Sequence, residues 1–269
     1  MHATLKAAAL AALLAGLAPG AAAQSDQRIV VPLSAPGQPA RLEVSLVMGT
    51  ISVTGYDGDE VIIVAGDEMD DEPEQPERNG LRRIPNTSIG LTAEERANAV
   101  SVAVDWINRE IDLAISVPRG TSVRASTVNG GDLTIEGVTG EHELSNVNGG
   151  ISATDVAGSV VANTTNGDVH VSFTELTPAK AMSFTSFNGD VEVSFPPDLA
   201  ADLRINAGRG EVLTDFDVNV QAQAPVVDRS GNEGRYRVRV EREVRAIVGA
   251  GGPEMHFKTF NGDIVIRRR

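Results

Sequence analysis

The 269-residue sequence contains no cysteine and few aromatic residues. The absence of cysteine excludes disulfide bonds, thiol nucleophiles, thiolate metal sites and a lipid-modified N-terminal cysteine. Aromatic residues make up 4% of the chain, whereas hydrophobic residues of all kinds make up 41%. We therefore expect a core of valine, isoleucine, leucine and alanine. The sequence also lacks a Ser/His/Asp grouping, a metal-spaced histidine pair, a Gly-x-Ser-x-Gly elbow and a phosphate-binding loop, so it predicts no catalytic residue and no cofactor.

The N-terminal apolar run, residues 7–17, is too short to span a bilayer, which takes about 20 residues. It follows the positive charge of Lys6 and precedes three small residues that end at Ala23. This order is typical of a secretory signal peptide, so residues 1–23 are predicted to be removed after Ala23. The mature chain, residues 24–269, is then expected in the periplasm, at the cell surface or secreted, without a transmembrane span.

The formal net charge is −14, and loss of Lys6 with the signal peptide makes it −14 − 1 = −15. This charge disfavours nucleic acid and anionic membranes as partners. Between residues 66 and 84, seven acids surround Pro73 and Pro76 without apolar periodicity, which predicts a disordered acidic loop. Downstream of it, residues 92–96 fit one helical turn, with Thr92 as N-cap and Glu95 as its capping-box partner.

One phrase recurs five times: an Asn-Gly pair, then Gly or Asp, then alternating apolar residues. The pairs are Asn129-Gly130, Asn148-Gly149, Asn166-Gly167, Asn188-Gly189 and Asn261-Gly262. The first four lie 19, 18 and 22 residues apart, and turns of a second kind lie halfway between, at residues 137–140 and 155–158. Residues 48–53 form a degenerate copy that lacks the Asn.

Two architectures fit these repeats. Asn-Gly between alternating runs is a strong signal for a type I′ hairpin, which would give an antiparallel β-meander. Two unlike turns that each recur after 18–19 residues favour a parallel β-solenoid, because each corner must stack on its own copy. We favour this all-β, single-domain solenoid, with the meander as the alternative. Its predicted inward columns are Leu133 over Ile151 over Val169, Ile135 over Ala153 over Val171, and Val128 over Val147 over Thr165.

The repeated polar residues are candidates for chemistry. Asp132, Asp168, Asp190 and Asp263 would form one column of like charges, which makes them weak candidates for a cation site. Gly150 interrupts that column, so solvated turn aspartates are the preferred interpretation. We expect the five Asn residues to be structural, because Asn tolerates positive φ and its amide can hydrogen-bond along a stack. Register predicts that His142 points inward, and that His170 and His256 point outward.

Several segments match a known family. The match rests on residues 117–123, 126–130 and 137–140 and on the ending at residues 251–268, including Phe260-Asn261-Gly262-Asp263. The chain resembles the bacterial β-strand-repeat proteins labelled adhesins, a domain of unknown function related to the head domain called GIN. The similarity covers about residues 28–64 and 100–269. It implies an exported, solenoid-like domain and supplies no catalytic residues.

The sequence thus favours a non-catalytic, adhesin-like interaction or structural module of the cell envelope, whose partner is an envelope or extracellular protein or glycan. One alternative is a polysaccharide-acting β-helix enzyme, which would show acids and arginines gathered in a groove on one sheet face. Another is a periplasmic signalling accessory without a small ligand.

Overall fold

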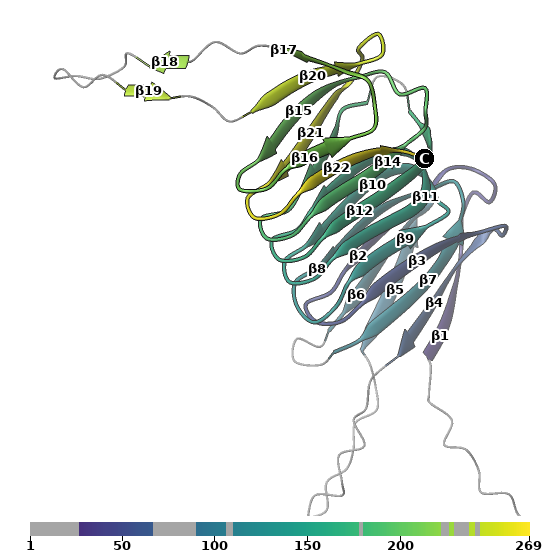
Figure 1. Ribbon diagram of the computed structural model, residues 1–269. Coiled ribbons are helices and arrows are strands. Elements are labelled where there is room, and N and C mark those ends of the chain that lie inside the picture. The colour runs from purple at the N-terminus through teal and green to yellow at the C-terminus, as the bar shows by residue number, and fades with distance from the viewer. Residues whose placement is uncertain are drawn as a thin grey trace, which may run out of the picture.

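A computed structural model describes residues 27–66, 90–105, 110–177, 180–221, 226–228, 237–239 and 243–269. The described elements are strands, and most of them lie in two largely parallel sheets packed face to face and joined by short corners (Figure 1). The chain therefore winds as a flattened solenoid, which confirms the predicted fold class. An antiparallel meander is wrong for the repeats, since every strand pair between their coils is parallel. Within the described residues, no helix is long and apolar enough to cross a membrane.

The first sheet contains, in spatial order, β5 (Leu91–Arg96), β6 (Ala99–Val104), β2 (Ala40–Ser45), β8 (Thr121–Thr127), β10 (Thr139–Asn146), the second half of β11 (Ile151–Asn163), β13 (Met182–Thr185), β21 (Glu254–Thr259), β15 (Ala201–Ala207), β20 (Val244–Val248) and β17 (Val218–Gln221). The pairs β5–β6, β15–β20 and β20–β17 are antiparallel, so this sheet changes from parallel to antiparallel at both ends.

The second sheet contains β1 (Gln27–Pro32), β4 (Glu60–Gly66), β7 (Asp112–Pro118), β3 (Ile51–Tyr56), β9 (Leu133–Glu136), the first half of β11, β12 (Val169–Leu176), β14 (Val191–Phe195), β22 (Ile264–Arg268) and β16 (Val212–Thr214). A separate antiparallel ribbon pairs β18 (Val226–Asp228) with β19 (Arg237–Arg239).

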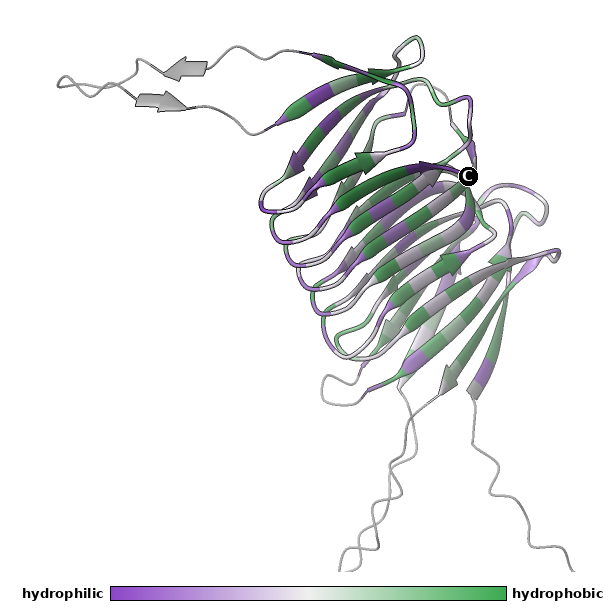
Figure 2. Cartoon of the chain, in the orientation of Figure 1, coloured by the Kyte–Doolittle hydropathy of each residue, from purple (hydrophilic) through white to green (hydrophobic). Residues whose placement is uncertain are grey.

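The core lies between the two sheets, and hydrophobic and hydrophilic residues alternate along most strands of these sheets (Figure 2). Leu133 pairs with Ile151 and Ile151 with Val169, and all three side chains are buried. The parallel column Ile135, Ala153 and Val171 is buried in the same way, so both of these predicted columns are confirmed. In the C-terminal coils the core becomes bulkier, because the rings of Phe173, Phe184, Phe195 and Phe257 pack against one another.

The first and last coils do not lie at the ends of the solenoid. The β2–β3 coil lies between β6–β7 and β8–β9. Met48 bridges Asn129 and Ile51 pairs with Leu133, so residues 48–53 are a true copy of the repeat. The C-terminal β21–β22 coil likewise lies between β13–β14 and β15–β16. Each terminal segment thus completes the solenoid by insertion between two coils that the chain forms elsewhere.

The segment predicted as a helical turn is strand β5, so that prediction is wrong. Its turn into β6 is a two-residue hairpin loop in which Ala97 (φ 53°) and Asn98 (φ 65°) both have positive φ, as a type I′ turn requires. Glu95 accepts hydrogen bonds there from Ser34 Oγ at 2.6 Å and from the Asn98 amide at 2.9 Å. These hydrogen bonds lower the pKa of Glu95. The carboxylate caps a hairpin rather than a helix.

Two predictions lie outside the described residues. They are the signal peptide at residues 1–23 and, apart from residues of β4, the acidic loop at residues 66–84. Both remain predictions.

Candidate functional site

The five Asn-Gly pairs form one row of corners that lead from the first sheet into the second, visible as the stacked turns at the left of Figure 1. The residue two positions before each Asn points into the solenoid and is buried; these residues are Thr127, Asn146, Thr164, Ser186 and Thr259. Each donates a side-chain hydrogen bond to a glycine carbonyl of the neighbouring coil, at 2.8–3.1 Å. This inner polar column joins successive coils at their corners.

The predicted inward column of Val128, Val147 and Thr165 is therefore wrong by one residue. All three side chains are exposed. Val123, Ala125 and Thr127 face inward along β8, so strict alternation along that strand already places Val128 outside. The apolar character of Val128 and Val147 suggested the core, but their strand parity carried the correct signal.

The Asn side chains form a ladder along the corners. Each Nδ2 donates to Oδ1 of the preceding Asn in the stack, at 2.7 Å (Asn148 to Asn129), 2.9 Å (Asn166 to Asn148), 2.8 Å (Asn188 to Asn166) and 2.7 Å (Asn261 to Asn188). The ladder Asn residues do not have positive φ. Instead, the following glycine does at Gly130, Gly167, Gly189 and Gly262, so the expected conformational role belongs to the glycine.

The aspartates next to this ladder accept backbone hydrogen bonds from the next coil. Oδ1 of Asp132 accepts from the amide of Gly150 at 2.7 Å, and those of Asp168, Asp190 and Asp263 accept from Asp190, Asp263 and Glu211 at 2.8 Å. Oδ1 of Asp112 likewise accepts a hydrogen bond from the Thr50 backbone amide, in the coils nearest the N-terminal end of the row. The repeat pattern did not reveal this contact. The described residues contain no group of three or more acidic or histidine side chains arranged to hold a metal ion. The geometry thus favours a backbone-capping role for these carboxylates.

A column of apolar side chains lies on the outside of the corners, beside the Asn ladder. Val47, Val128, Val147, Phe187 and Phe260 are each 37–51% exposed, and Thr165 occupies the same position in the coil between Val147 and Phe187. The column is continuous, because the backbone N–H of each ladder Asn donates to the backbone carbonyl of the preceding column residue. Asn148, for example, donates to Val128 at 3.0 Å. We call this apolar column together with the Asn ladder the corner ridge. Exposed apolar side chains gathered in one line are typical of interaction sites.

Aromatic side chains form the C-terminal end of the corner ridge. The rings of Phe187 and Phe260 stack with their centroids 5.0 Å apart and their planes 10° apart. The guanidinium of Arg209 lies over the Phe260 ring, 5.1 Å from its centroid. At the other end of the ridge, a shallow open depression is lined by Thr50, Gly131, Asp132, Thr134 and Asn148.

The histidines are oriented as their register predicted. His142 is buried in the core opposite Val160, and neither ring nitrogen has a hydrogen-bond partner among the described residues. Burial lowers the pKa of His142 to about 4, so the ring is neutral at pH 7. His170 is exposed on the outer face of β12, 3.7 Å from Glu192, and His256 is partly exposed on β21. They are too far apart in the strand order to act together.

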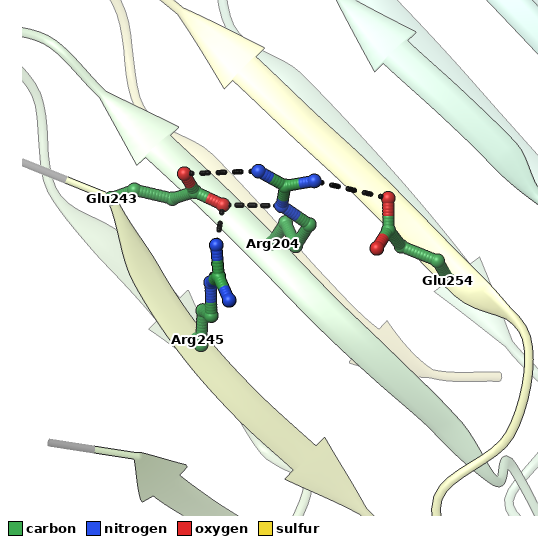
Figure 3. Close-up of polar contacts among 4 residues, drawn as sticks. All are labelled: Arg204, Glu243, Arg245 and Glu254. Atoms are coloured by element: carbon green, nitrogen blue, oxygen red, sulfur yellow. Dashed lines mark hydrogen bonds and ion pairs between the residues drawn. The ribbon is translucent and has the colours of Figure 1, made fainter. Parts of the chain in front are cut away.

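A second polar cluster is formed by residues of β15, β20 and β21 and by Glu243, which directly precedes β20, and its four side chains point towards one another (Figure 3). Arg204 forms a bidentate ion pair with Glu243 and a 3.3 Å contact with Glu254, while Arg245 lies 3.7 Å from Glu243. The hydrogen bond from Arg204 lowers the pKa of Glu243, and the two glutamates raise the pKa of Arg204. A general acid in glycoside hydrolysis requires a raised pKa. This cluster therefore fits an ionic clamp on the C-terminal coil better than a pair of catalytic acids.

Comparison with known proteins identifies the domain but not its activity. A family model described as Toastrack DUF4097 matches residues 97–243, which is more than half of the chain. The matched region contains the Asn ladder from Asn129 to Asn188. No curated protein is significantly similar to this chain in sequence. The crystal structure of "a putative cell adhesion protein" from Clostridium sporogenes aligns with 91% of this chain and 100% of its own, at 10% identity and a TM-score of 0.40. At these values the likeness carries no argument about function.

Proposed function

The chain belongs to the Toastrack DUF4097 family, a domain of unknown function, and from this premise we propose that it is a non-catalytic, adhesin-like interaction module. It acts after export, at the cell envelope, and the corner ridge is the surface that contacts its partner. The N-terminal targeting pattern of residues 1–23 supports the export part of this proposal.

The exposure of the corner ridge is the observation that carries the proposal. Corner residues of a solenoid need only short polar side chains to remain soluble, yet this row exposes three valines and two phenylalanines in one line. Other large apolar side chains are exposed at the C-terminal end, such as Leu213 and Val220, but these belong to two edge strands in different sheets. The ridge is continuous, since it crosses successive coils from Val47 to Phe260.

The polar groups of the molecule support a binding role over catalysis. Some charged side chains on the outer sheet faces form ion pairs, as Arg124 does with Glu143 and Arg267 does with Glu192. Among the described residues, the cluster around Arg204 holds its glutamates as paired carboxylates. A polysaccharide-acting enzyme remains the alternative from the sequence, and the structure offers it no pair of acids with separated pKa values among the described residues.

Sedimentation of the mature chain with isolated cell envelopes tests the proposal. The chain should pellet with the envelopes, and the substitution pair Phe187→Ser and Phe260→Ser should reduce the pelleted fraction several-fold. Leu213→Ser with Val220→Ser is the matched control, because it removes equally exposed apolar side chains away from the ridge. Equal pelleting of the ridge variant and the parent would contradict the assignment of the ridge.

A further inference from the structure

The hydrogen-bonding capacity of the Asn ladder points to a particular kind of partner. A carboxamide offers two N–H donors and two acceptor lone pairs. In Asn148, Asn166 and Asn188 the ladder uses one donor and one lone pair of each. Each of these exposed amides therefore keeps a second donor and a second acceptor for a ligand. Adjacent coils lie about 4.8 Å apart, so these pairs repeat at that interval along the ridge.

Hydroxyl groups match such an array because each can donate and accept at once. The apolar column beside the ladder can add van der Waals contacts to these hydrogen bonds. Its valine methyl groups and the exposed parts of Phe187 and Phe260 give apolar surface that can pack against the C–H groups of a sugar ring. An extended β-linked polysaccharide advances along its axis by close to one coil spacing per sugar. One sugar can thus face each coil of the ridge.

The charges along the ridge select among polysaccharides. The carboxylates of Asp132, Asp168, Asp190 and Asp263 line its second-sheet side, one in most coils. Like charges on a ligand would be repelled along the whole row. The guanidinium of Arg209 lies over Phe260, at one end of the apolar column. The row of carboxylates therefore disfavours an anionic polymer and permits a neutral one.

We infer that the corner ridge binds an extended, neutral, β-linked polysaccharide along the solenoid axis, with about one sugar per coil. This inference rests on the proposed function, and it names the chemistry of the partner. It also explains why the ladder uses amides, which stay uncharged, where a charged side chain would serve solubility equally well.

The inference is tested by binding of the mature chain to neutral β-glucan and chitin oligosaccharides of increasing length, with β-linked polymannuronate as the anionic comparison. Affinity should rise with length until the oligosaccharide is about as long as the five-amide ladder. Phe187→Ser with Phe260→Ser should weaken binding about tenfold or more, and Leu213→Ser should not. Melting curves of each variant establish that it is folded.

Absence of binding to every neutral probe would overturn the inference, as would binding that is equal in the parent and the ridge variant. Stronger binding of polymannuronate than of neutral chains would also overturn it. The two proposals are separable. If envelope sedimentation depends on the ridge while neutral oligosaccharides do not bind, the proposed function stands and the polysaccharide inference fails.

Discussion

The ring centroids of Phe187 and Phe260 lie 5.0 Å apart, although the two residues are far apart in the chain, beside the fourth and the fifth Asn-Gly pairs. The contact exists because the C-terminal β21–β22 coil inserts beside β13–β14. That insertion extends both the Asn ladder and the apolar column by one coil. The corner ridge therefore depends on the order in which coils stack, which differs from their order in the chain.

A designed disulfide tests the coil order. Because the chain has no cysteine, Phe187→Cys with Phe260→Cys introduces a single possible pair. Residues at equivalent positions of adjacent coils meet the separation that a disulfide needs, about 4.4–6.8 Å between Cα atoms. We expect rapid cross-linking on mild oxidation, measured as a mobility shift on non-reducing gels. Phe187→Cys with Val128→Cys is the control, since two coils lie between these residues, and it should stay reduced. The reverse result would refute the insertion.

Neighbouring threonines test the register at the corner. Thr164 is buried and donates to the Gly149 carbonyl at 2.8 Å, whereas Thr165 is exposed. Thr164→Val keeps the shape but leaves that carbonyl without its partner, so it should cost about 1–2 kcal/mol of unfolding free energy. Thr165→Val should change stability by less than about 0.5 kcal/mol. Urea unfolding measures both, and a larger loss for Thr165→Val would mean that the sequence-based register was right.

Two adjacent glycines differ in the space that they leave. A Cβ on Gly149 would lie 2.3 Å from the Gly131 carbonyl oxygen, whereas a Cβ on Gly150 would lie 3.4 Å from its nearest neighbours. Neither residue has positive φ, so space alone distinguishes them. Gly149→Ala should destabilise the fold by about 1–3 kcal/mol through overpacking. Gly150→Ala should stabilise it by about 0.4–1 kcal/mol, because alanine restricts the unfolded chain. Similar unfolding midpoints for the two variants would contradict the close stacking of the corners.

The buried His142 predicts acid sensitivity. Its pKa is about 4 in the folded chain and near 6.5 in the unfolded chain. The unfolded state therefore binds a proton first as the pH falls, and stability is full above pH 6.5 and lost between pH 6.5 and 4. The loss amounts to about 3 kcal/mol by pH 4. His142→Leu should remove this part of the pH dependence, measured as the difference from the parent in urea unfolding at pH 7.5 and 4.5. A constant difference across that range would show that His142 does not titrate as described.

The fold was largely predictable because its information is local and repetitive. Turns of two kinds at a fixed interval specify a solenoid, and strand parity placed Leu133, Ile151 and Val169 inside. The stacking order was not predictable, because Asn261 carries the same phrase as Asn188 and nothing local states which coils will be neighbours. Likewise, the Asn-Gly pairs, which usually indicate a type I′ hairpin turn, form the corners of the solenoid. A hairpin turn with positive φ is found instead at Ala97 and Asn98.

The candidate site was only partly predictable. The Asn positions and the aspartates followed from the repeat, but the partners of their side chains depend on the coil spacing. The apolar column was missed because Val128 and Val147, which lie beside strands, were assigned to the core. Thr127 faces inward, where its hydroxyl donates to a glycine carbonyl. Because successive side chains along a strand alternate sides, the following residue, Val128, must face outward.

Hydroxyl-radical footprinting of the mature chain, with and without isolated cell envelopes, tests most directly whether the corner ridge is the contact surface. Phe187 and Phe260 are exposed in the free chain and should be modified there. With envelopes, the account predicts that modification of both phenylalanines falls several-fold while that of Leu213 stays constant. Protection of Leu213 with unchanged modification of Phe187 and Phe260 would contradict it.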